Sequence, residues 1–196
     1  SPSRGLGDVY KRQRAAGAAA AAGSGCAPRA PHAEAAVDEE VAEVAVLSTL
    51  PKGWSTKLSS AKWQERKDAL DTLLAPLARA PRVPRREFHE MSELLRTLKR
   101  VIGTDANVNV VGSAVRAAGL LARALGPDFA RLAKEYVPLL LDKCAEKNKI
   151  VCDALYTALD LVAASGAAAP ADVAEWAASG LASKTPAVRL AAAEWL

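Results

Sequence analysis

Apolar residues recur at helical spacing along the chain from Val37 onward. In most groups successive members lie three, four or seven residues apart and so fall on one helical face. The groups are Val41, Val44, Val46 and Leu47; Trp63, Leu70, Leu74 and Leu77; Phe88, Met91, Leu95, Leu98 and Ile102; Val108, Val111, Val115 and Ala118; Phe129, Leu132, Tyr136 and Leu140; Val151, Leu155, Leu159 and Val162; and Val173, Trp176, Leu181, Val188 and Trp195. The first group predicts a short helix that ends before Pro51. No strand-like alternation of useful length interrupts the groups, so the pattern predicts an all-α fold.

The breaks between these helices are of two kinds, loose and tight, which alternate along the chain. The loose breaks span residues 78–84, 125–128 and 164–170, and the tight, polar ones span 59–62, 103–106, 146–149 and 183–186. This alternation predicts antiparallel hairpins. The tight turns recur after 41, 44 and 37 residues when measured at Lys62, Gly103, Lys147 and Lys184. That period is typical of HEAT-repeat solenoids, in which all the tight turns emerge on one edge and often carry the binding residues.

Residues 1–36 differ in composition from the rest of the chain. Ser1–Gln13 has no periodicity and resembles adaptor sequence at the end of an assembled transcript. The Ala/Gly-rich run that follows supplies too little side-chain surface to offset the entropy of ordering. We therefore expect residues 1–36 to be disordered. Residues 37–196 are expected to form a helical-repeat domain, with repeats at about 51–80, 84–125, 128–164 and 170–196.

Composition excludes several function classes. The 196-residue chain is 51% hydrophobic and has a net charge of +4, well short of a domain that binds nucleic acid by charge alone. It has no run of about 18 apolar residues and no secretory signal at its start, so we expect no membrane partner. Two histidines and three cysteines do not make the usual zinc cages, and no glycine-rich phosphate loop follows a strand. We expect an intracellular, soluble protein that is not an enzyme and uses no metal or cofactor.

The tight turns carry the candidate binding residues. Trp63 begins a helix directly after Lys62, and periodicity leaves open whether it is a core residue or an exposed anchor. Asp105 and Asn107 are each suited either to cap a helix or to contact a ligand. The basic side chains Lys62, Arg66, Lys67, Lys147, Lys149, Lys184 and Arg189 outnumber the acidic Glu65, Asp105 and Glu146. This bias predicts an acidic protein partner that is attracted by charge and held by an aromatic side chain.

The segment LPKGWSTKLSSAKWQERKDALDTLL (50–74) is very similar to the opening repeat of TOG domains, the tubulin-binding HEAT arrays of the XMAP/Dis/Stu microtubule polymerases. The similarity continues through VIGTDANVNVVGSAVRAAGLLARAL, VPLLLDKCAEKNKIVCDALYTALD and SKTPAVRLAAAEWL, so it covers about residues 41–196. Its most specific part is SAKWQERKDAL. Within the family, the chain most resembles the second TOG domain of the animal proteins. TOG domains have six HEAT repeats, so the resemblance implies a C-terminally truncated fragment with about three and a half of them.

The resemblance also implies a partner and a place of action. TOG domains bind the curved αβ-tubulin heterodimer through their intra-repeat turns, promote polymerisation at microtubule plus ends, and act in the cytoplasm on microtubules, spindle poles or the microtubule-organising centre. Trp63 matches the residue that inserts against β-tubulin. The candidate tubulin-binding residues are Lys62, Trp63, Arg66, Asn107, Val108, Lys147, Lys149, Lys184 and Arg189. Two alternatives stay open: a generic HEAT-repeat scaffold, because a repeat fold does not name its ligand, and a CLASP-type TOG domain that acts in microtubule rescue.

Overall fold

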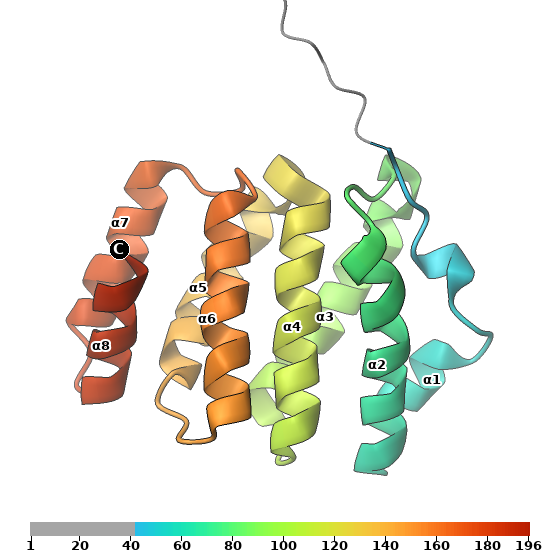
Figure 1. Cartoon of the computed structure of the whole chain (residues 1–196), viewed down its shortest axis with the longest axis horizontal. Helices are drawn as coiled ribbons and strands as arrows, with labels where there is room; N and C mark the ends of the chain where they lie inside the picture. The colour runs from blue at the N-terminus through green and yellow to red at the C-terminus, as the bar shows by residue number, and fades with distance from the viewer. Residues whose placement is uncertain (1–41) are drawn as a thin grey trace, which may run out of the picture. The chain divides into compact units, whose positions relative to one another are not determined.

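The computed structural model describes residues 42–196, which form a row of stacked helical hairpins (Figure 1). The helices are α1 (Trp54–Leu58), α2 (Trp63–Arg79), α3 (Phe88–Thr104), α4 (Val108–Leu125), α5 (Ala130–Lys143), α6 (Lys149–Ala164), α7 (Pro170–Leu181) and α8 (Pro186–Trp195). Short 3-10 turns lie at η1 (Leu47–Thr49), η2 (Arg85–Glu87) and η3 (Gly126–Phe129). The expectation of disorder over residues 1–36, and Val41 of the first predicted helix, lie outside the described residues.

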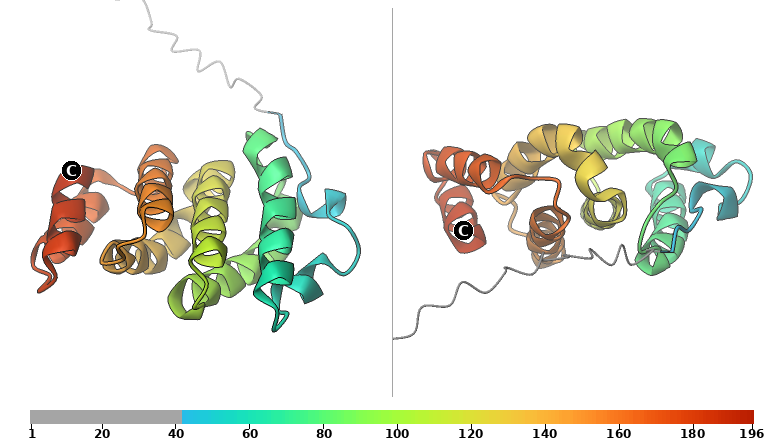
Figure 2. Two further views of the ribbon diagram at one scale, coloured as in Figure 1. Left: turned by 60° about the horizontal axis from the view of Figure 1, so that its bottom comes forward. Right: turned by 90° about the horizontal axis from the view of Figure 1, so that it is seen from above.

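The helices of residues 42–196 pair as the alternating breaks predict: α1 with α2, α3 with α4, α5 with α6, and α7 with α8. Helices α2, α4 and α6 pack side by side in one layer, and α3, α5 and α7 form a second layer behind them (Figure 2). In this part of the chain there is no strand, apart from an isolated bridge between Glu43 and Arg82. The predicted all-α HEAT-repeat solenoid is confirmed.

Helix α4 lies between α2 and α6 and is buried along most of its length. At Gly119 its backbone approaches α6 so closely that an added Cβ would lie 2.8 Å from the Cα of Ala158. The stretch Val108–Lys143 contains an 18-residue window with a mean hydropathy of 1.3, apolar enough to cross a membrane by length and composition alone. However, 72% of that window is buried inside the fold, which is the behaviour of core helices.

The helix predicted from Val41, Val44, Val46 and Leu47 is wrong over the part that the structure describes. The backbone N–H of Val44 donates to the carbonyl of Arg82 at 2.8 Å. Those of Val46 and Leu47 donate to the buried carboxylate of Glu87 at 2.9 and 3.1 Å. Since these N–H groups are bonded to residues about 40 positions away, they are not available for an α-helix, and a single 3-10 turn follows.

The first hairpin contains two tryptophans with opposite environments. Trp54 is buried, and its indole N–H donates to the carbonyl of Ala69 at 2.5 Å, which fastens the short helix α1 to α2. Trp63 begins α2 and its side chain stays 39% exposed. Trp54 therefore supplies the core of this hairpin, and Trp63 is available to a partner.

Candidate protein-binding edge

All four tight turns emerge on one edge of the solenoid, at the bottom of Figure 1. They comprise residues 59–62, 105–107, 144–148 and 182–185, and we call this surface the turn edge. Each hairpin runs out through an odd-numbered helix and returns through an even-numbered one. Since the hairpins stack in the same direction, the even-numbered helices all begin at this edge.

The first turn presents Trp63 from a well-bonded frame. The hydroxyl of Ser60 donates to the Glu65 carboxylate at 2.6 Å and accepts the backbone N–H of Lys62 at 3.1 Å. The Lys62 ammonium lies 3.3 Å from Glu65 and remains 76% exposed. The Ser60 hydrogen bond, followed by the Lys62 hydrogen bond, lowers the pKa of Glu65 below its usual value. The turn therefore holds Trp63 at the start of α2 and leaves Lys62 free to face a partner.

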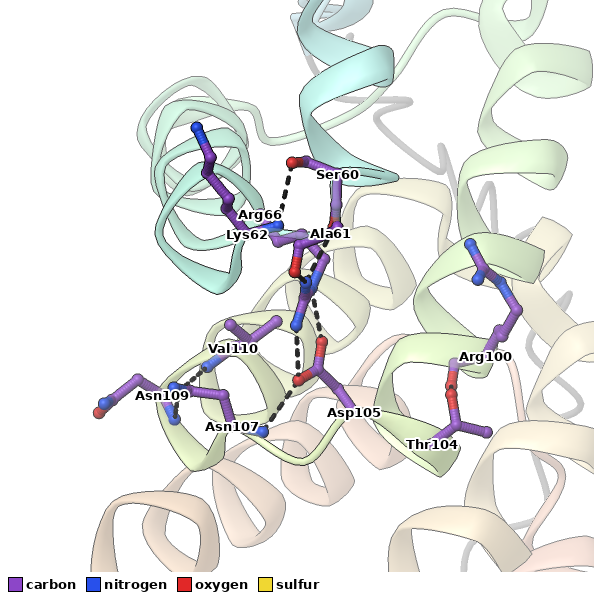
Figure 3. Close-up of polar contacts among 10 residues, drawn as sticks. All are labelled: Ser60, Ala61, Lys62, Arg66, Arg100, Thr104, Asp105, Asn107, Asn109 and Val110. Carbon is purple, nitrogen blue, oxygen red and sulfur yellow. Dashed lines mark hydrogen bonds and ion pairs between the residues drawn. The ribbon is translucent and has the colours of Figure 1, made fainter.

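Arg66, one of the candidate binding residues, points into the protein, and its side chain is only 18% exposed (Figure 3). Its Nε and Nη2 donate to the Asp105 carboxylate at 2.8 and 3.0 Å. Its Nη1 donates to the carbonyls of Ser60 and Ala61 at 2.8 and 2.9 Å. The Asp105 carboxylate also accepts the backbone N–H of Asn107 at 2.9 Å. Arg66 therefore joins the first turn to the second, and its charge is neutralised there rather than offered to a ligand.

The second turn ends in a capped helix. The Asn107 side-chain oxygen accepts the N–H groups of Asn109 and Val110 at 3.0 and 3.4 Å, as an N-cap does. Asn107 is half-buried as a result, whereas Val108 follows it at the first helical position with 37% exposure. Capping thus accounts for the Asn107 oxygen and leaves Val108 as the projecting side chain of this turn.

The third and fourth turns carry exposed cations. Lys147 is exposed, and Lys149 is 88% exposed although its ammonium lies 3.3 Å from Asp153. In the fourth turn Lys184 is exposed. These lysines extend from the turn edge as the sequence predicts, whereas Lys67 lies back along α2 and pairs with Asp71.

Arg189, in the last helix of the solenoid, repeats part of the hydrogen-bond geometry of Arg66. Its Nη1 donates to the carbonyls of Ser183 and Lys184 at 2.9 and 3.0 Å, six and five residues earlier in the chain, as Arg66 does in the first turn. Each arginine is the fourth residue of its helix. Unlike Arg66, Arg189 is exposed and has no bonded carboxylate within residues 42–196. It stiffens the fourth turn and keeps an accessible charge.

Sequence analysis missed one exposed residue of the turn edge, Ile150. It is the second residue of α6 and is 47% exposed. The side chain of Asn148, the N-cap, accepts its backbone N–H at 3.0 Å. An apolar residue one or two positions after a capping Asn, as in Asn107–Val108 and Asn148–Lys149–Ile150, is the signal that would have identified it.

The described residues contain no constellation suited to metal chemistry. No group of three or more His, Cys, Asp or Glu side chains in this part of the chain is placed to hold an ion. Burial raises the pKa of the Cys144 thiol to about 12, so this cysteine stays protonated at neutral pH. The exposed side chains of the turn edge described above are mainly apolar and basic.

Several known proteins are similar to this chain in sequence or in fold. Curated relatives include mini spindles of Drosophila melanogaster, 38% identical over 122 residues, and alp14, a spindle pole body component of Schizosaccharomyces pombe, 32% identical over 149 residues. MOR1 of Oryza sativa is 34% identical over 169 residues, or 85% of this chain. A solved structure concerned with tubulin recruitment and assembly by microtubule polymerases with TOG domain arrays has a TM-score of 0.70 and 29% identity, and covers 81% of this chain and 32% of that chain. The chain belongs to the TOG-domain family.

A second solved structure supports the same family. It concerns microtubule plus-end tracking by XMAP215, CLIP-170 and EB1, and it matches this TOG domain with a TM-score of 0.71 and 34% identity over 79% of this chain and 62% of that chain. No family model matches the chain. The matches with mini spindles and alp14 cover 62% and 76% of this chain. The chain spans 6%, 18% and 8% of the lengths of mini spindles, alp14 and rice MOR1.

Proposed function

We propose that this TOG domain is a non-enzymatic module that captures the αβ-tubulin heterodimer through its turn edge and acts at microtubule plus ends and on the spindle. The observation that carries the proposal is Trp63, a tryptophan held 39% exposed at the first position of a helix, on the same edge as the lysines. Tryptophan is strongly enriched among residues that dominate protein interfaces. The similar proteins support tubulin as the ligand, because one is described as a spindle pole body component and one solved structure concerns tubulin recruitment.

The turn-edge residues divide into three roles in this proposal. Trp63 and Val108 supply apolar contact at the first and second turns. The exposed ammonium groups of Lys62, Lys147, Lys149 and Lys184, with the guanidinium of Arg189, attract an acidic surface and orient it. Arg66 and the side-chain oxygen of Asn107 act within the protein and hold the turns in place.

A rigid edge suits a ligand that changes curvature. The turns are fixed relative to one another by packing and, between the first two, by the Arg66–Asp105 pair. Such a rigid surface can contact all its sites on the ligand at once only when the ligand has one particular curvature. Tubulin would therefore bind in its curved, unpolymerised form and be released as it straightens in the lattice, through the difference in affinity between the two states.

The substitution Trp63→Ala tests the proposal. An interface hot spot contributes about 2 kcal/mol or more, so tubulin binding should weaken about 30-fold or more. Binding is measured by analytical ultracentrifugation of the 196-residue chain with unpolymerised αβ-tubulin. Because the lysines are exposed, raising the salt from about 50 to about 250 mM should also weaken wild-type binding.

Two controls separate the possible failures. The thermal melt of Trp63→Ala should lie within about 2 °C of wild type, since the indole is partly exposed at a helix end. Wild-type protein that does not bind tubulin would refute the proposed function. Binding by the folded Trp63→Ala variant with wild-type affinity would refute the role of this residue while leaving the ligand in place.

A further inference from the structure

Exposed large apolar side chains are not scattered over the described residues. Residues 42–196 have six of them, and three lie in the first turns of three neighbouring helices at the turn edge. Trp63 is the first residue of α2, Val108 the first of α4, and Ile150 the second of α6, with exposures of 39%, 37% and 47%. Single exposed apolar residues need no explanation, but a repeated position on adjacent repeats does.

The side chain of Ile150 lies against α4. A Cβ added to Gly112 would be 3.5 Å from Cγ2 of Ile150, so the isoleucine rests over bare backbone at that point. Gly112 is one helical turn after Val108 and shares its face of α4. No side chain at position 112 therefore separates the apolar surface of α6 from that of α4.

Trp63 and Val108 lie beside two turns that are joined to each other. The Arg66–Asp105 pair ties the first turn of α2 to the residues that precede α4. At the starts of α4 and α6 the capping oxygens of Asn107 and Asn148 accept backbone N–H groups of the first turn. The apolar residues that follow the caps are left facing outward.

We infer that Trp63, Val108 and Ile150 form one apolar row, and that Ile150 is a third contact through which this domain binds tubulin. The inference rests on the proposed function. It fits a partner surface with an apolar strip bordered by acidic groups, because Lys62 lies beside Trp63 and Lys147 and Lys149 lie beside Ile150. The third turn then binds by apolar burial as well as by charge, and these two contributions respond differently to salt.

The experiment compares Ile150→Ala and the β-branched Ile150→Thr with wild type in ultracentrifugation with unpolymerised tubulin at about 50 and about 250 mM salt. Both variants should bind about fivefold to tenfold more weakly at either salt concentration. The loss caused by Lys149→Ala should shrink at the higher salt. Leu196→Ala is the matched control: this exposed leucine follows the far end of α8, away from the turn edge, and binding should be unchanged.

The outcomes distinguish this inference from the proposed function. If wild type binds, Trp63→Ala weakens binding, and folded Ile150→Ala and Ile150→Thr bind like wild type, the role of Ile150 is overturned and the tubulin assignment stands. If wild type does not bind tubulin, both are overturned. A loss for Ile150→Ala that disappears at high salt also overturns the inference, because an apolar contact is not screened by ions.

Discussion

The pair formed by Arg66 and Asp105 gives a stability prediction that can be worked from the structure. In Arg66→Met, one carboxylate oxygen of Asp105 keeps the Asn107 N–H, and the other loses its partner. The Asp105 side chain is only 6% exposed and that of Arg66 18%, so the pair lies between an exposed ion pair, worth about 0–1 kcal/mol, and a fully buried one, whose breakage costs about 3–5 kcal/mol. We expect a loss of about 2–3 kcal/mol.

The measurement is a thermal melt followed by circular dichroism. For a domain of this size, about 2–3 kcal/mol corresponds to a lower Tm by about 5–10 °C. Arg189→Met is the matched control, because Arg189 makes the same two backbone hydrogen bonds but has no bonded carboxylate in the described part of the chain. It should lower the Tm by less than about 3 °C.

A double-mutant cycle isolates the contact between the two turns. If the guanidinium and the carboxylate stabilise the protein through each other, Arg66→Met and Asp105→Asn together should cost less than the sum of the two single substitutions. Equal Tm shifts for Arg66→Met and Arg189→Met would show that the carboxylate adds nothing and that the reasoning is incorrect.

Two further predictions concern packing and thiol chemistry. Gly119→Ala should destabilise the protein by about 1–3 kcal/mol, because its Cβ would lie 2.8 Å from the Ala158 Cα. Gly103→Ala, where nothing lies within 4 Å of the added Cβ, should stabilise the protein by about 0.5 kcal/mol. Urea unfolding measures both changes, and shifts of the same sign would contradict the close approach of α4 and α6. At pH 8 iodoacetamide should alkylate the half-exposed Cys152 well before Cys144, since burial raises the Cys144 pKa to about 12 and the thiolate is scarce below that pH. Peptide mass mapping distinguishes the two, and equal rates in the native protein would contradict the burial of Cys144.

Helix positions and the shared edge of the tight turns could be predicted from sequence because both depend on local spacing. The apolar period marks α2 to α6 clearly, and Pro186, at the end of the break predicted over 183–186, is the first residue of α8. The segment around Val46 was mispredicted because its conformation depends on Glu87 and Arg82, which lie far along the chain. Apolar spacing alone carries no information about such partners.

The candidate site was predicted less completely than the fold. Trp63 and Leu70 share a helical phase, and only the structure shows that Trp63 lies beyond the packed part of α2 and stays exposed. Arg66 and Lys62 look equivalent in sequence, but Arg66 bonds to Asp105 39 residues away and Lys62 faces solvent. A count of basic residues therefore does not show which cations face solvent. Such a count also gives no sign of Ile150, which is apolar.

At the turn edge, the first residues of α4 and α6 divide helix capping and surface exposure between neighbouring positions. Asn107 and Asn148 bond to backbone N–H groups, and Val108 and Ile150, one and two residues later, project outward. Under the proposed function, we expect a mutation at an outward position to alter recognition with little effect on folding, and a mutation at a cap to do the reverse. Duplicated copies of such a domain could diverge in ligand preference while melting at the same temperature, which gives evolution, or an engineer, a surface to vary on an unchanged scaffold.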